Sequence, residues 1–511
     1  MLGRDKICAV VAARDARSMR RQLVRALRQT RTVELRLDWL SSDAEITRFL
    51  GFLAALKPHA NMIATCRRRA AGGRYRGTIA KQLANLALAI GCGCRWYDIE
   101  IESVRRCPPE LLHVMLGSAR QLISAHFFRG MPASLPRVAA ELRRYQPDAI
   151  KIAAQCRSLA DSRKLLDFAR KQRNIVAVPM GDVALPARFL ALRSKHAFAY
   201  APVENATAPG QLSLEEMKVR YRANQFGART GVYGVIGDPI VHSLSPVMQN
   251  AAFAARRMNA VYLPFLVRDL KDFLSSVAPL GIRGFSVTLP HKERILSRLD
   301  GCDPLAARIG AVNTIVVRGG GKLYGYNTDY IGVLRSLEGR MPLRVSRVLI
   351  VGAGGVARAV AFALAQAGAS VCVCARRHER AKVLARAVGG EAVARVRIRR
   401  EFFDAIVNAT PVGMYPDVGS SPLDARELNC RLIFDTIYRP RLTRLLQLAA
   451  RRGIEISSGL EMFVAQGAAQ WEIWTGERAP VAAMRQAVVR ALAGEEKMRG
   501  KQRMGKFRTR R

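Results

Sequence analysis

The sequence predicts an α/β fold, with an N-terminal (β/α)8 barrel followed by a second α/β unit of two domains. Two observations predict the barrel. Eight short apolar or alternating runs recur at near-even spacing in about the first 220 residues, and stretches long enough for helices lie between them. A change of motif pattern after this region predicts the second unit. At 511 residues the chain is also too long for a single hydrophobic core.

The eight runs follow the order strand, helix, strand that indicates a parallel sheet. Their number and the length of the region fit a (β/α)8 barrel, and an open doubly wound sheet with extra strands is the alternative. The stretches 44–56 and 158–172 have the period of amphipathic helices. The predicted strands are ICAVVA (7–12), VELRLD (33–38), NMIATC (61–66), WYDIEIE (96–102), QLISAHF (121–127), AIKIAA (149–154), IVAVPM (175–180) and HAFAYA (196–201).

The composition is strongly basic, with 83 Lys and Arg residues against 40 Asp and Glu and a net charge of +43. Such a charge predicts attraction for anions, from small carboxylates to nucleic acid. Because the charge is spread along the chain and no zinc-finger, RNA-recognition or clear helix-turn-helix motif is present, we expect no specific nucleic-acid partner. The one dense basic block lies in 495–511, which we expect to be a disordered tail.

The sequence also bears on the compartment. No apolar run is long enough to span a membrane, and the first residues resemble neither a signal peptide nor a transit peptide. The ten cysteines include no pair with zinc-ligand spacing. These features predict a cytoplasmic protein with reduced thiols and no metal site.

Polar residues interrupt the predicted strands near their C-terminal ends, where (β/α)8 barrels carry their chemistry. Lys151 is unusual because an ammonium is costly to bury. Either its amine reaches water at the strand end, or its neutral amine attacks a carbonyl. His126, taken alone, fits a core histidine equally well. Together these residues suit a Schiff base with a carboxylate-bearing ketone. They are Glu34, Arg36, Asp38, Arg67, Glu100, Glu102, His126, Lys151, Arg188, Thr207 and Gln211.

The second half begins with short polar residues at strand ends. Ser243 and Ser245 lie in a loop before a proline, where serines cap a helix or bind a polyol. A lysine and an aspartate in one pocket can share a proton and act as acid and base, although spacing alone does not show that they meet. The candidates are Thr288, Lys292, Asn313, Asn327 and Asp329.

The segment RVLIVGAGGVARAVAFALAQAGASVCVCARR (347–377) predicts a strand, a glycine-rich turn, a helix and a second strand. Gly352, Gly354 and Gly355 allow the backbone to approach a pyrophosphate at the helix N-terminus, and Ala357 takes the third position of the common GxGxxG/A fingerprint. The pattern predicts a Rossmann domain that binds a dinucleotide.

The end of the second strand selects the cofactor. An NAD site places Asp or Glu there to bind the ribose 2′-hydroxyl. This chain has Ala375, Arg376, Arg377 and Arg380, which favour the 2′-phosphate of NADP(H), with Glu379 close by.

The motifs VELRLD, IEIE, SAHFF, IKIA, PMGDVALPAR and ATAPGQLS resemble those of type I 3-dehydroquinate dehydratase over about residues 5–218. The resemblance implies that Lys151 forms an imine with the ring ketone of the substrate, that His126 is the general base, and that Glu100 orients His126. The sequence departs from the family pattern at Ala125, Ala184 and Ala187. The residues implied to hold the substrate are Glu34, Arg36, Arg67, Arg188, Thr207 and Gln211.

The motifs SLSP, VTLPHK, AVNT, YNTD, GAGGVARA, NATPVGM, YRPRLTRLL and GLEMFVAQGAAQWEIWTG resemble shikimate dehydrogenase, in the same order, over about residues 230–494. The resemblance implies Lys292 and Asp329 as the catalytic pair. The implied substrate residues are Ser243, Ser245, Thr288, Asn313, Tyr438, Gly459 and Gln466, besides Asp329. The implied NADP residues are Gly352, Ala353, Gly354, Gly355, Val356, Ala375, Arg376, Arg377 and Arg380. The sequence departs from the family pattern at Gln249, Ser286 and Ala375.

The two halves together imply a bifunctional enzyme that dehydrates 3-dehydroquinate and then reduces 3-dehydroshikimate to shikimate with NADPH. The alternative is a quinate/shikimate-type dehydrogenase fused to a barrel that is inactive or has another Schiff-base activity. The predicted parts are the barrel (1–220), a substrate-binding domain (230–330), a Rossmann domain (331–459), a segment that returns to the substrate-binding domain (460–494) and the tail (495–511).

Overall fold

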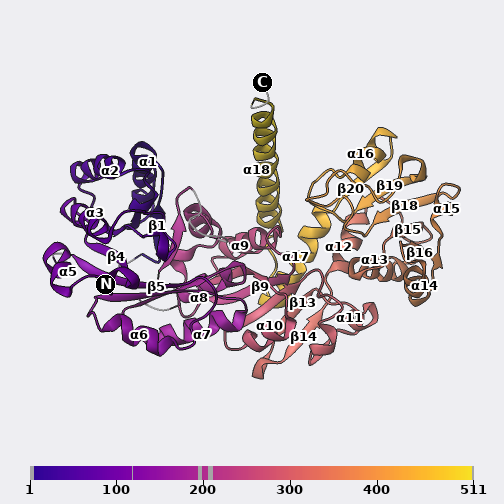
Figure 1. Cartoon of the computed structure of the whole chain (residues 1–511). Coiled ribbons are helices and arrows are strands. Elements are labelled where there is room, and N and C mark those ends of the chain that lie inside the picture. The colour runs from indigo at the N-terminus through magenta and orange to yellow at the C-terminus, as the bar shows by residue number, and fades with distance from the viewer. Residues whose placement is uncertain (1–4, 118, 194–197, 205–210, 509–511) are drawn as a thin grey trace. The chain divides into compact units, whose positions relative to one another are not determined.

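The computed structural model describes residues 5–117, 119–193, 198–204 and 211–508 (Figure 1). The chain divides into two compact units. The first comprises Met1–Gly231 and Pro264–Gly281, and the second comprises Val232–Leu263 and Ile282–Arg511. No helix in the described ranges is long and apolar enough to cross a membrane.

The first unit confirms the predicted barrel. Its eight strands form a parallel sheet in the order β7-β6-β5-β4-β3-β2-β1-β8, so the sheet is nearly closed. Each predicted run overlaps one strand. The strands are β1 (Ile7–Val11), β2 (Thr32–Arg36), β3 (Asn61–Thr65), β4 (Trp96–Glu100), β5 (Arg120–Phe127), β6 (Ala149–Gln155), β7 (Ile175–Met180) and β8 (Ala199–Pro202).

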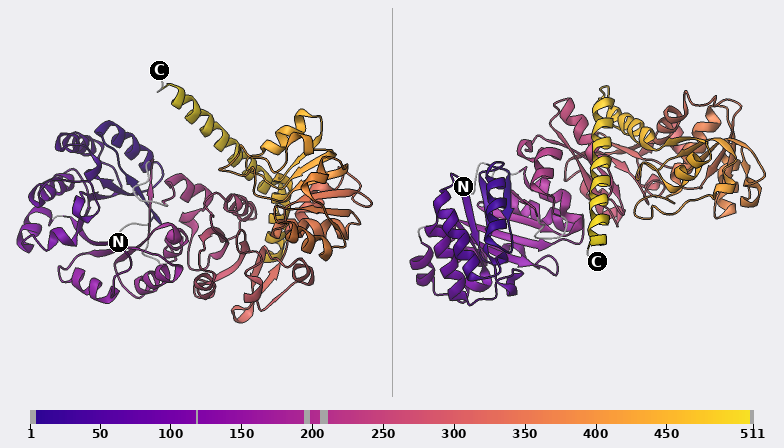
Figure 2. Two further views of the ribbon diagram at one scale, coloured as in Figure 1. Left: turned by 45° about the vertical axis from the view of Figure 1, so that its right-hand side comes forward. Right: turned by 90° about the horizontal axis from the view of Figure 1, so that it is seen from above.

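The helices lie outside the strands (Figure 2). Several begin at a side-chain cap that satisfies free backbone N–H groups. Ser158 and Asp161, for example, form a reciprocal capping box at the start of one of them. The helices are α1 (Ala16–Leu27), α2 (Asp43–Leu56), α3 (Ile79–Gly91), α4 (Ile101–Val104), α5 (Pro109–Leu116), α6 (Leu135–Arg143), α7 (Leu159–Arg170) and α8 (Leu185–Ala191).

The barrel interior changes from apolar to polar along the strands. The apolar layer consists of Cys8, Ile63, Trp96, Leu122, Ala149, Val176 and Phe198. Because side chains two positions apart on a strand share a face, the next inward layer follows directly from this one. That next layer contains Thr65, Asp98, Ser124, Lys151 and Tyr200. The polar groups therefore lie closer to the C-terminal ends of the strands than the apolar layer does.

The second unit contains two six-stranded sheets. The first has the order β10-β9-β11-β13-β14-β12, in which β11 pairs parallel with β9 and antiparallel with β13. Its strands are β9 (Gly231–Gly237), β10 (Ala260–Leu266), β11 (Ile282–Val287), β12 (Gly301–Cys302), β13 (Thr314–Val317) and β14 (Leu323–Tyr326). The helices of this region are α9 (Ser245–Ala255) and α11 (Pro304–Ile309), while α10 (Leu270–Val277) lies in the segment Pro264–Gly281 that belongs to the first unit.

The second sheet is parallel throughout, with the order β17-β16-β15-β18-β19-β20. This is the doubly wound order of a dinucleotide-binding fold, with the switch point between β15 and β18. Its strands are β15 (Arg347–Val351), β16 (Ser370–Cys374), β17 (Glu391–Ala392), β18 (Phe403–Asn408), β19 (Cys430–Asp435) and β20 (Glu455–Ser458). Its helices include α12 (Asp329–Leu337), α13 (Gly355–Gln366), α14 (His378–Ala387), α15 (Arg395–Ile398) and α16 (Arg444–Arg451).

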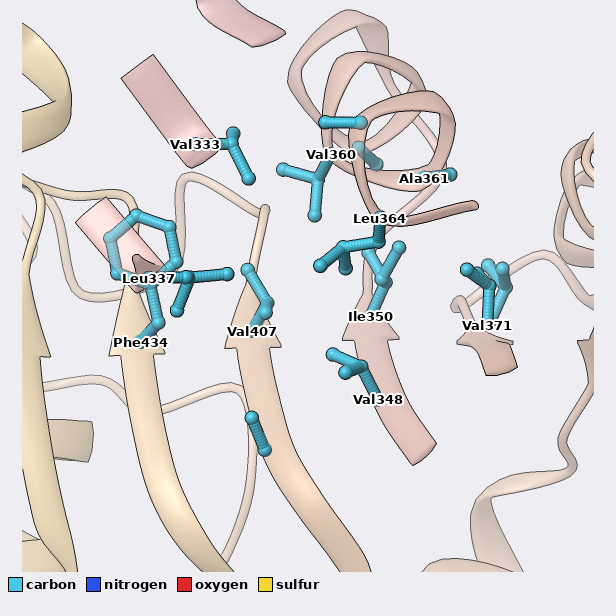
Figure 3. Close-up of a cluster of buried hydrophobic side chains, with 14 of the residues drawn as sticks. Val333, Leu337, Val348, Ile350, Val360, Ala361, Leu364, Val371, Val407 and Phe434 are labelled. Atoms are coloured by element: carbon cyan, nitrogen blue, oxygen red, sulfur yellow. The ribbon is translucent and has the colours of Figure 1, made fainter. Parts of the chain in front are cut away.

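A hydrophobic core packs helices α12 and α13 against this sheet (Figure 3). Ile350 on β15 and Val407 on β18 face Leu364 of α13 and Leu337 of α12, and all four side chains are fully buried. Burying an aliphatic side chain of this size contributes about 1.5–3 kcal/mol, so this layer holds α13 on the sheet. The glycine-rich turn lies at the start of α13.

The last two helices are α17 (Leu460–Thr475) and α18 (Val481–Arg508). In α17, Trp474 donates from its indole nitrogen to the Ile315 carbonyl of β13 at 2.9 Å. The disorder expected for 495–511 is not found in the described part of that segment, 495–508, which continues α18. Extending an existing helix adds hydrogen bonds without a new nucleation step, and the segment is rich in the helix formers Glu, Lys, Arg and Met.

Candidate active sites

Lys151 points into the barrel from β6 and is buried, with 3% of its side chain exposed. Its Nζ atom donates to the Asp98 carboxylate, lies 3.2 Å from the Tyr200 hydroxyl and lies 3.7 Å from a Glu34 carboxylate oxygen. The amine therefore does not reach water at the strand end, and the simpler interpretation of the sequence is wrong. A buried ammonium is tolerated here because a carboxylate answers its charge.

Asp98 is the central acid of this site, and sequence reasoning missed it. Besides Lys151 it accepts from Arg67 Nη2 at 2.9 Å and from Ser124 Oγ at 2.6 Å. Burial alone would raise its pKa, but the charges of Lys151 and Arg67 outweigh burial and hold the pKa below its ordinary value. The signal was present in WYDIEIE, because Asp98 lies two positions before Glu100 and so shares its face of the strand.

His126 lies on β5 and stacks on Phe128, with ring centroids 6.0 Å apart. Burial, together with the charges of Arg67 and Lys151, lowers the pKa of His126 well below its ordinary value. Its Nδ1 atom is buried without a hydrogen-bond partner among the described residues. A neutral imidazole with a free nitrogen can accept a proton, which is what a general base requires.

The expected contact between Glu100 and His126 is absent from the described residues. Glu100 ends β4, and its carboxylate accepts from Gln82 Nε2 at 3.0 Å and from Ser103 Oγ at 3.0 Å. The chain turns into helix α4 directly after Glu100, which carries the carboxylate toward the outer helices. Glu102, expected at the end of the strand, lies in that helix.

The remaining barrel residues differ in how fully they are paired. Arg36 donates to Asp38 through two bonds, of 2.9 and 2.8 Å, while the Glu34 carboxylate accepts from Thr65 Oγ1 at 3.0 Å. Arg188 donates to a backbone carbonyl, and burial lowers its pKa to about 10. Gln211 is described at the edge of this unit, whereas Thr207 lies outside the described residues.

The second unit brings together the lysine and aspartate that spacing could not connect. Lys292 Nζ lies 2.5 Å from Asp329 Oδ2, although the two residues are 37 positions apart. Asn313 Nδ2 donates to the other carboxylate oxygen at 2.8 Å. Asp329 opens helix α12, so its carboxylate is held from two sides.

The other predicted substrate residues lie on several elements of the same unit. Ser245, at the start of α9, is mostly buried, and its backbone N–H donates to Ser243 Oγ at 3.3 Å. Tyr438 stacks on Phe463 at 4.1 Å, and Gln466 donates to the Phe463 carbonyl at 2.8 Å. A side chain at Gly459 would clash with the Thr436 carbonyl oxygen, and Thr288 follows β11 directly.

Ser286, a departure from the family pattern, belongs to a buried hydrogen-bond chain. It accepts from the Tyr262 hydroxyl at 2.6 Å and donates to Gln470 Oε1 at 2.7 Å. Gln249, another departure, donates to the Gly467 carbonyl at 2.9 Å. Ser286 therefore joins α17 to the substrate-binding sheet, and Gln249 joins α17 to α9.

The glycine-rich turn fits a dinucleotide. Gly352 has φ of +124°, and a side chain there would meet the Ala409 carbonyl oxygen at 2.9 Å. A Cβ at Gly354 would meet nothing within 4 Å, so space is open before the N-terminus of α13. A Cβ at Gly355 would lie 3.4 Å from Lys292 Cβ. The turn therefore adjoins the Lys292–Asp329 pair. Ala353 and Val356 complete this turn.

The end of β16 carries cations and no carboxylate that could bind a ribose. Arg376, Arg377 and Arg380 are exposed there, and Ala375 is half-buried. Glu379, the acidic residue close to these arginines in the sequence, accepts from Lys382 at 2.9 Å. Exposed guanidinium groups at this position suit a 2′-phosphate. Among the described residues, no group of three His, Cys, Asp or Glu side chains could hold a metal ion.

Comparison with known proteins assigns both halves. The family model of type I 3-dehydroquinase matches residues 7–226. The models of the shikimate dehydrogenase substrate binding domain, of shikimate/quinate 5-dehydrogenase and of the shikimate 5′-dehydrogenase C-terminal domain match residues 235–315, 336–410 and 459–489.

Individual relatives agree with these matches. The chloroplastic bifunctional 3-dehydroquinate dehydratase/shikimate dehydrogenase of Arabidopsis thaliana is 34% identical over 472 residues, 88% of this chain and 78% of that protein. The shikimate dehydrogenase (NADP(+)) of Moorella thermoacetica is 48% identical over 276 residues, 51% of this chain and 93% of that protein. A solved shikimate 5-dehydrogenase from Thermus thermophilus, in complex with NADP(H) and shikimate, is 38% identical, covers 52% of this chain and 100% of its own, and has a TM-score of 0.48.

One relative aligns with both halves in a single chain, and the family models match them in the same order. The chain therefore belongs to the family of bifunctional 3-dehydroquinate dehydratase/shikimate dehydrogenases.

Proposed function

We propose that the barrel dehydrates 3-dehydroquinate to 3-dehydroshikimate through an imine on Lys151, and that the second unit reduces 3-dehydroshikimate to shikimate with NADPH. One observation carries the proposal. Each half places a lysine against an aspartate at the point where its own reaction needs one, Lys151 beside Asp98 and Lys292 beside Asp329.

In the barrel, the Lys151 amine attacks the ring ketone, and loss of water gives a protonated imine. The imine draws electrons from the neighbouring carbon, so His126, held neutral, can remove a proton from that carbon. The ring hydroxyl takes that proton from His126 and leaves as water, and hydrolysis of the imine returns the free lysine. Asp98 stays ionised throughout and offsets the positive charge on the nitrogen.

Arginines of the barrel are suited to the ring carboxylate. Arg67 donates to Asp98, which also accepts from Lys151 Nζ, so its guanidinium lies near the reacting nitrogen. Arg188 provides a second guanidinium. Arg36 already donates two hydrogen bonds to Asp38, so it contributes mainly to the shape of the barrel opening. Glu34, Thr207 and Gln211 would bind ring hydroxyls.

In the second unit, NADPH, when bound along the Gly352–Val356 turn, supplies the hydride to the ketone carbon. Lys292 delivers the proton that the resulting alcohol oxygen needs, and Asp329 holds that lysine in place. Ser243, Ser245, Thr288, Asn313, Tyr438 and Gln466 would bind the carboxylate and hydroxyls of the ring. Arg376, Arg377 and Arg380 would bind the 2′-phosphate.

The test is to give the intact chain 3-dehydroquinate and NADPH together and to follow NADPH absorbance and product by chromatography. We expect NADPH to be consumed and shikimate to appear. Consumption only after 3-dehydroshikimate is added would contradict the dehydratase half. Faster NADP(+) reduction with quinate than with shikimate would contradict the choice of ring substrate.

The partners and the compartment are also part of the proposal. We infer small-molecule substrates without a specific nucleic-acid partner. A cytoplasmic location is supported by the ten cysteines, all free in the structure, as expected of a reducing compartment.

A further inference from the structure

Tyr200 touches the nitrogen atom that the dehydratase reaction uses. Its hydroxyl lies 3.2 Å from Lys151 Nζ, and the nitrogen lies 4.7 Å from the centre of the tyrosine ring. The two residues come from β8 and β6, so the contact crosses the barrel interior. Neither the predicted strand HAFAYA nor any motif of the sequence pointed to this residue.

The tyrosine ring is held firmly where it lies. It meets Phe198 edge-on, with ring centroids 5.1 Å apart, and it packs against the apolar layer at the base of the barrel. A ring fixed along most of its length aims its hydroxyl in one direction. The hydroxyl is therefore a fixed point against which the flexible Lys151 side chain can be placed.

The groups around Lys151 Nζ differ in what they can offer. Asp98 and Glu34, as carboxylates, only accept hydrogen bonds. Burial, followed by the charge of Glu34, raises the pKa of Tyr200 well above its ordinary value, so the phenol stays neutral. A neutral phenol both accepts and donates. Among the described residues that contact Nζ, Tyr200 is therefore the one that can serve the ammonium, the amine and the imine in turn.

We propose that Tyr200 is a positioning residue for the Lys151 amine. Its oxygen accepts one N–H of the amine and so turns the nitrogen lone pair toward the substrate carbonyl. Without Tyr200, Asp98 would supply the one hydrogen bond to the nitrogen and leave it free to rotate, because the Glu34 oxygen, at 3.7 Å, is too far away to form another. With two contacts at an angle to each other, the direction of attack is set before the substrate arrives. This inference rests on the proposed dehydratase reaction and adds a residue to it.

The test is Tyr200→Phe in the full chain, because phenylalanine keeps the ring and removes only the hydroxyl. We measure the rate constant for imine formation with 3-dehydroquinate by borohydride trapping and intact mass, and kcat and KM for dehydration. Loss of one hydrogen bond predicts a fall of roughly 3- to 10-fold in the trapping rate constant and in kcat, with KM unchanged. The trapping rate constant, unlike a kcat calculated from total protein, does not depend on the fraction of protein that is folded, so partial misfolding does not imitate a fall in it.

Two controls make the result specific. Tyr97→Phe removes a buried phenol from the neighbouring position to Asp98 on β4, on the opposite face of that strand, and should leave both constants unchanged. Shikimate dehydrogenation by the same samples should also be unchanged. A Tyr200→Phe variant that traps as fast as the parent would overturn the inference alone. A parent chain that forms no adduct would overturn the proposed dehydratase function itself, and a rise in KM without a fall in the trapping rate would show that Tyr200 binds substrate and does not position the amine.

Discussion

The barrel and the second unit each contain a lysine paired with an aspartate, but the two pairs differ in depth and support. Lys151 lies within a strand, and only 3% of its side chain and none of that of Asp98 is exposed. Lys292 lies in a loop after β11, and 12% of its side chain and 7% of that of Asp329 are exposed. One pair is enclosed by a barrel, and the other adjoins the turn that would carry a cofactor.

The difference fits the role that we propose for each lysine. A lysine that becomes covalently bound to its substrate needs a fixed nitrogen and an environment without competing water. A lysine that exchanges a proton needs access to the alcohol oxygen and, afterwards, to solvent that restores the proton. Under this proposal, the same pair of residue types serves two reactions because the fold gives each pair a different exposure.

The largest expected effect is that of Lys151→Met. It should lower dehydration by roughly four orders of magnitude or more, since the nucleophile is lost, and shikimate dehydrogenation should stay at the level of the parent chain. The mass adduct formed with 3-dehydroquinate and borohydride should disappear. A residual adduct at the parental level would assign the imine to another lysine.

The second change is Lys292→Met, which should lower shikimate dehydrogenation by about 10²- to 10⁴-fold, the usual contribution of a proton-transfer group. Dehydration should be unaffected. Steady-state rates of both reactions on one sample provide the measurement, and Lys382→Met, which removes a lysine that pairs with Glu379 on the surface, is the matched control. Equal losses of shikimate dehydrogenation in Lys292→Met and in Lys382→Met would contradict the role of Lys292.

The third change compares the acids. Asp98→Asn leaves a fully buried ammonium without its charge partner, which should lower local stability by about 3–5 kcal/mol. Asp329→Asn removes the partner of a more exposed lysine, and we expect a loss of about 1–3 kcal/mol. Hydrogen exchange measured peptide by peptide separates β6 from α12 and so reports each effect. A larger loss of local stability at α12 than at β6 would contradict our interpretation that the more deeply buried pair depends more on its aspartate.

These acids also mark how far the sequence could predict the sites. The barrel followed from eight evenly spaced runs, because inward and outward side chains alternate along strands and leave a readable pattern. The Rossmann domain followed from one glycine-rich turn between a strand and a helix. Both features are local in sequence, which is why sequence alone was sufficient to predict them.

Contacts between distant elements were not predictable in the same way. The pairing of Lys292 with Asp329 depends on a loop and a helix 37 positions apart. Tyr200 lay hidden in an apolar run, and the direction of Glu100 was mispredicted because the chain turns into a helix immediately after it. Asp98 was overlooked although its alternation with Glu100 was visible, so the sequence indicated a strand face but not which acid on it meets the lysine.

The smallest expected effect concerns pH. Burial, then the charges of Arg67 and Lys151, lowers the pKa of His126, and the base is active only when neutral. Dehydration loses activity where falling pH protonates this imidazole. A lowered pKa places that limb below the ordinary histidine value of about 6.5, so kcat should still be near its maximum at that pH.

Arg67→Met tests the cause. Removing one nearby positive charge lets the pKa of His126 rise, so the acid limb of kcat should move to higher pH. Because burial is the larger cause and remains, the shift should be about one pH unit or less. The measurement is kcat for dehydration across the acid range at saturating substrate, since we propose that the arginine also binds the ring carboxylate. Arg105→Met, which removes an exposed arginine paired with Glu141, is the matched control and should leave the limb in place. A limb that moves to lower pH in Arg67→Met would mean that a group other than His126 accepts the proton, and the enclosed lysine would then need another base.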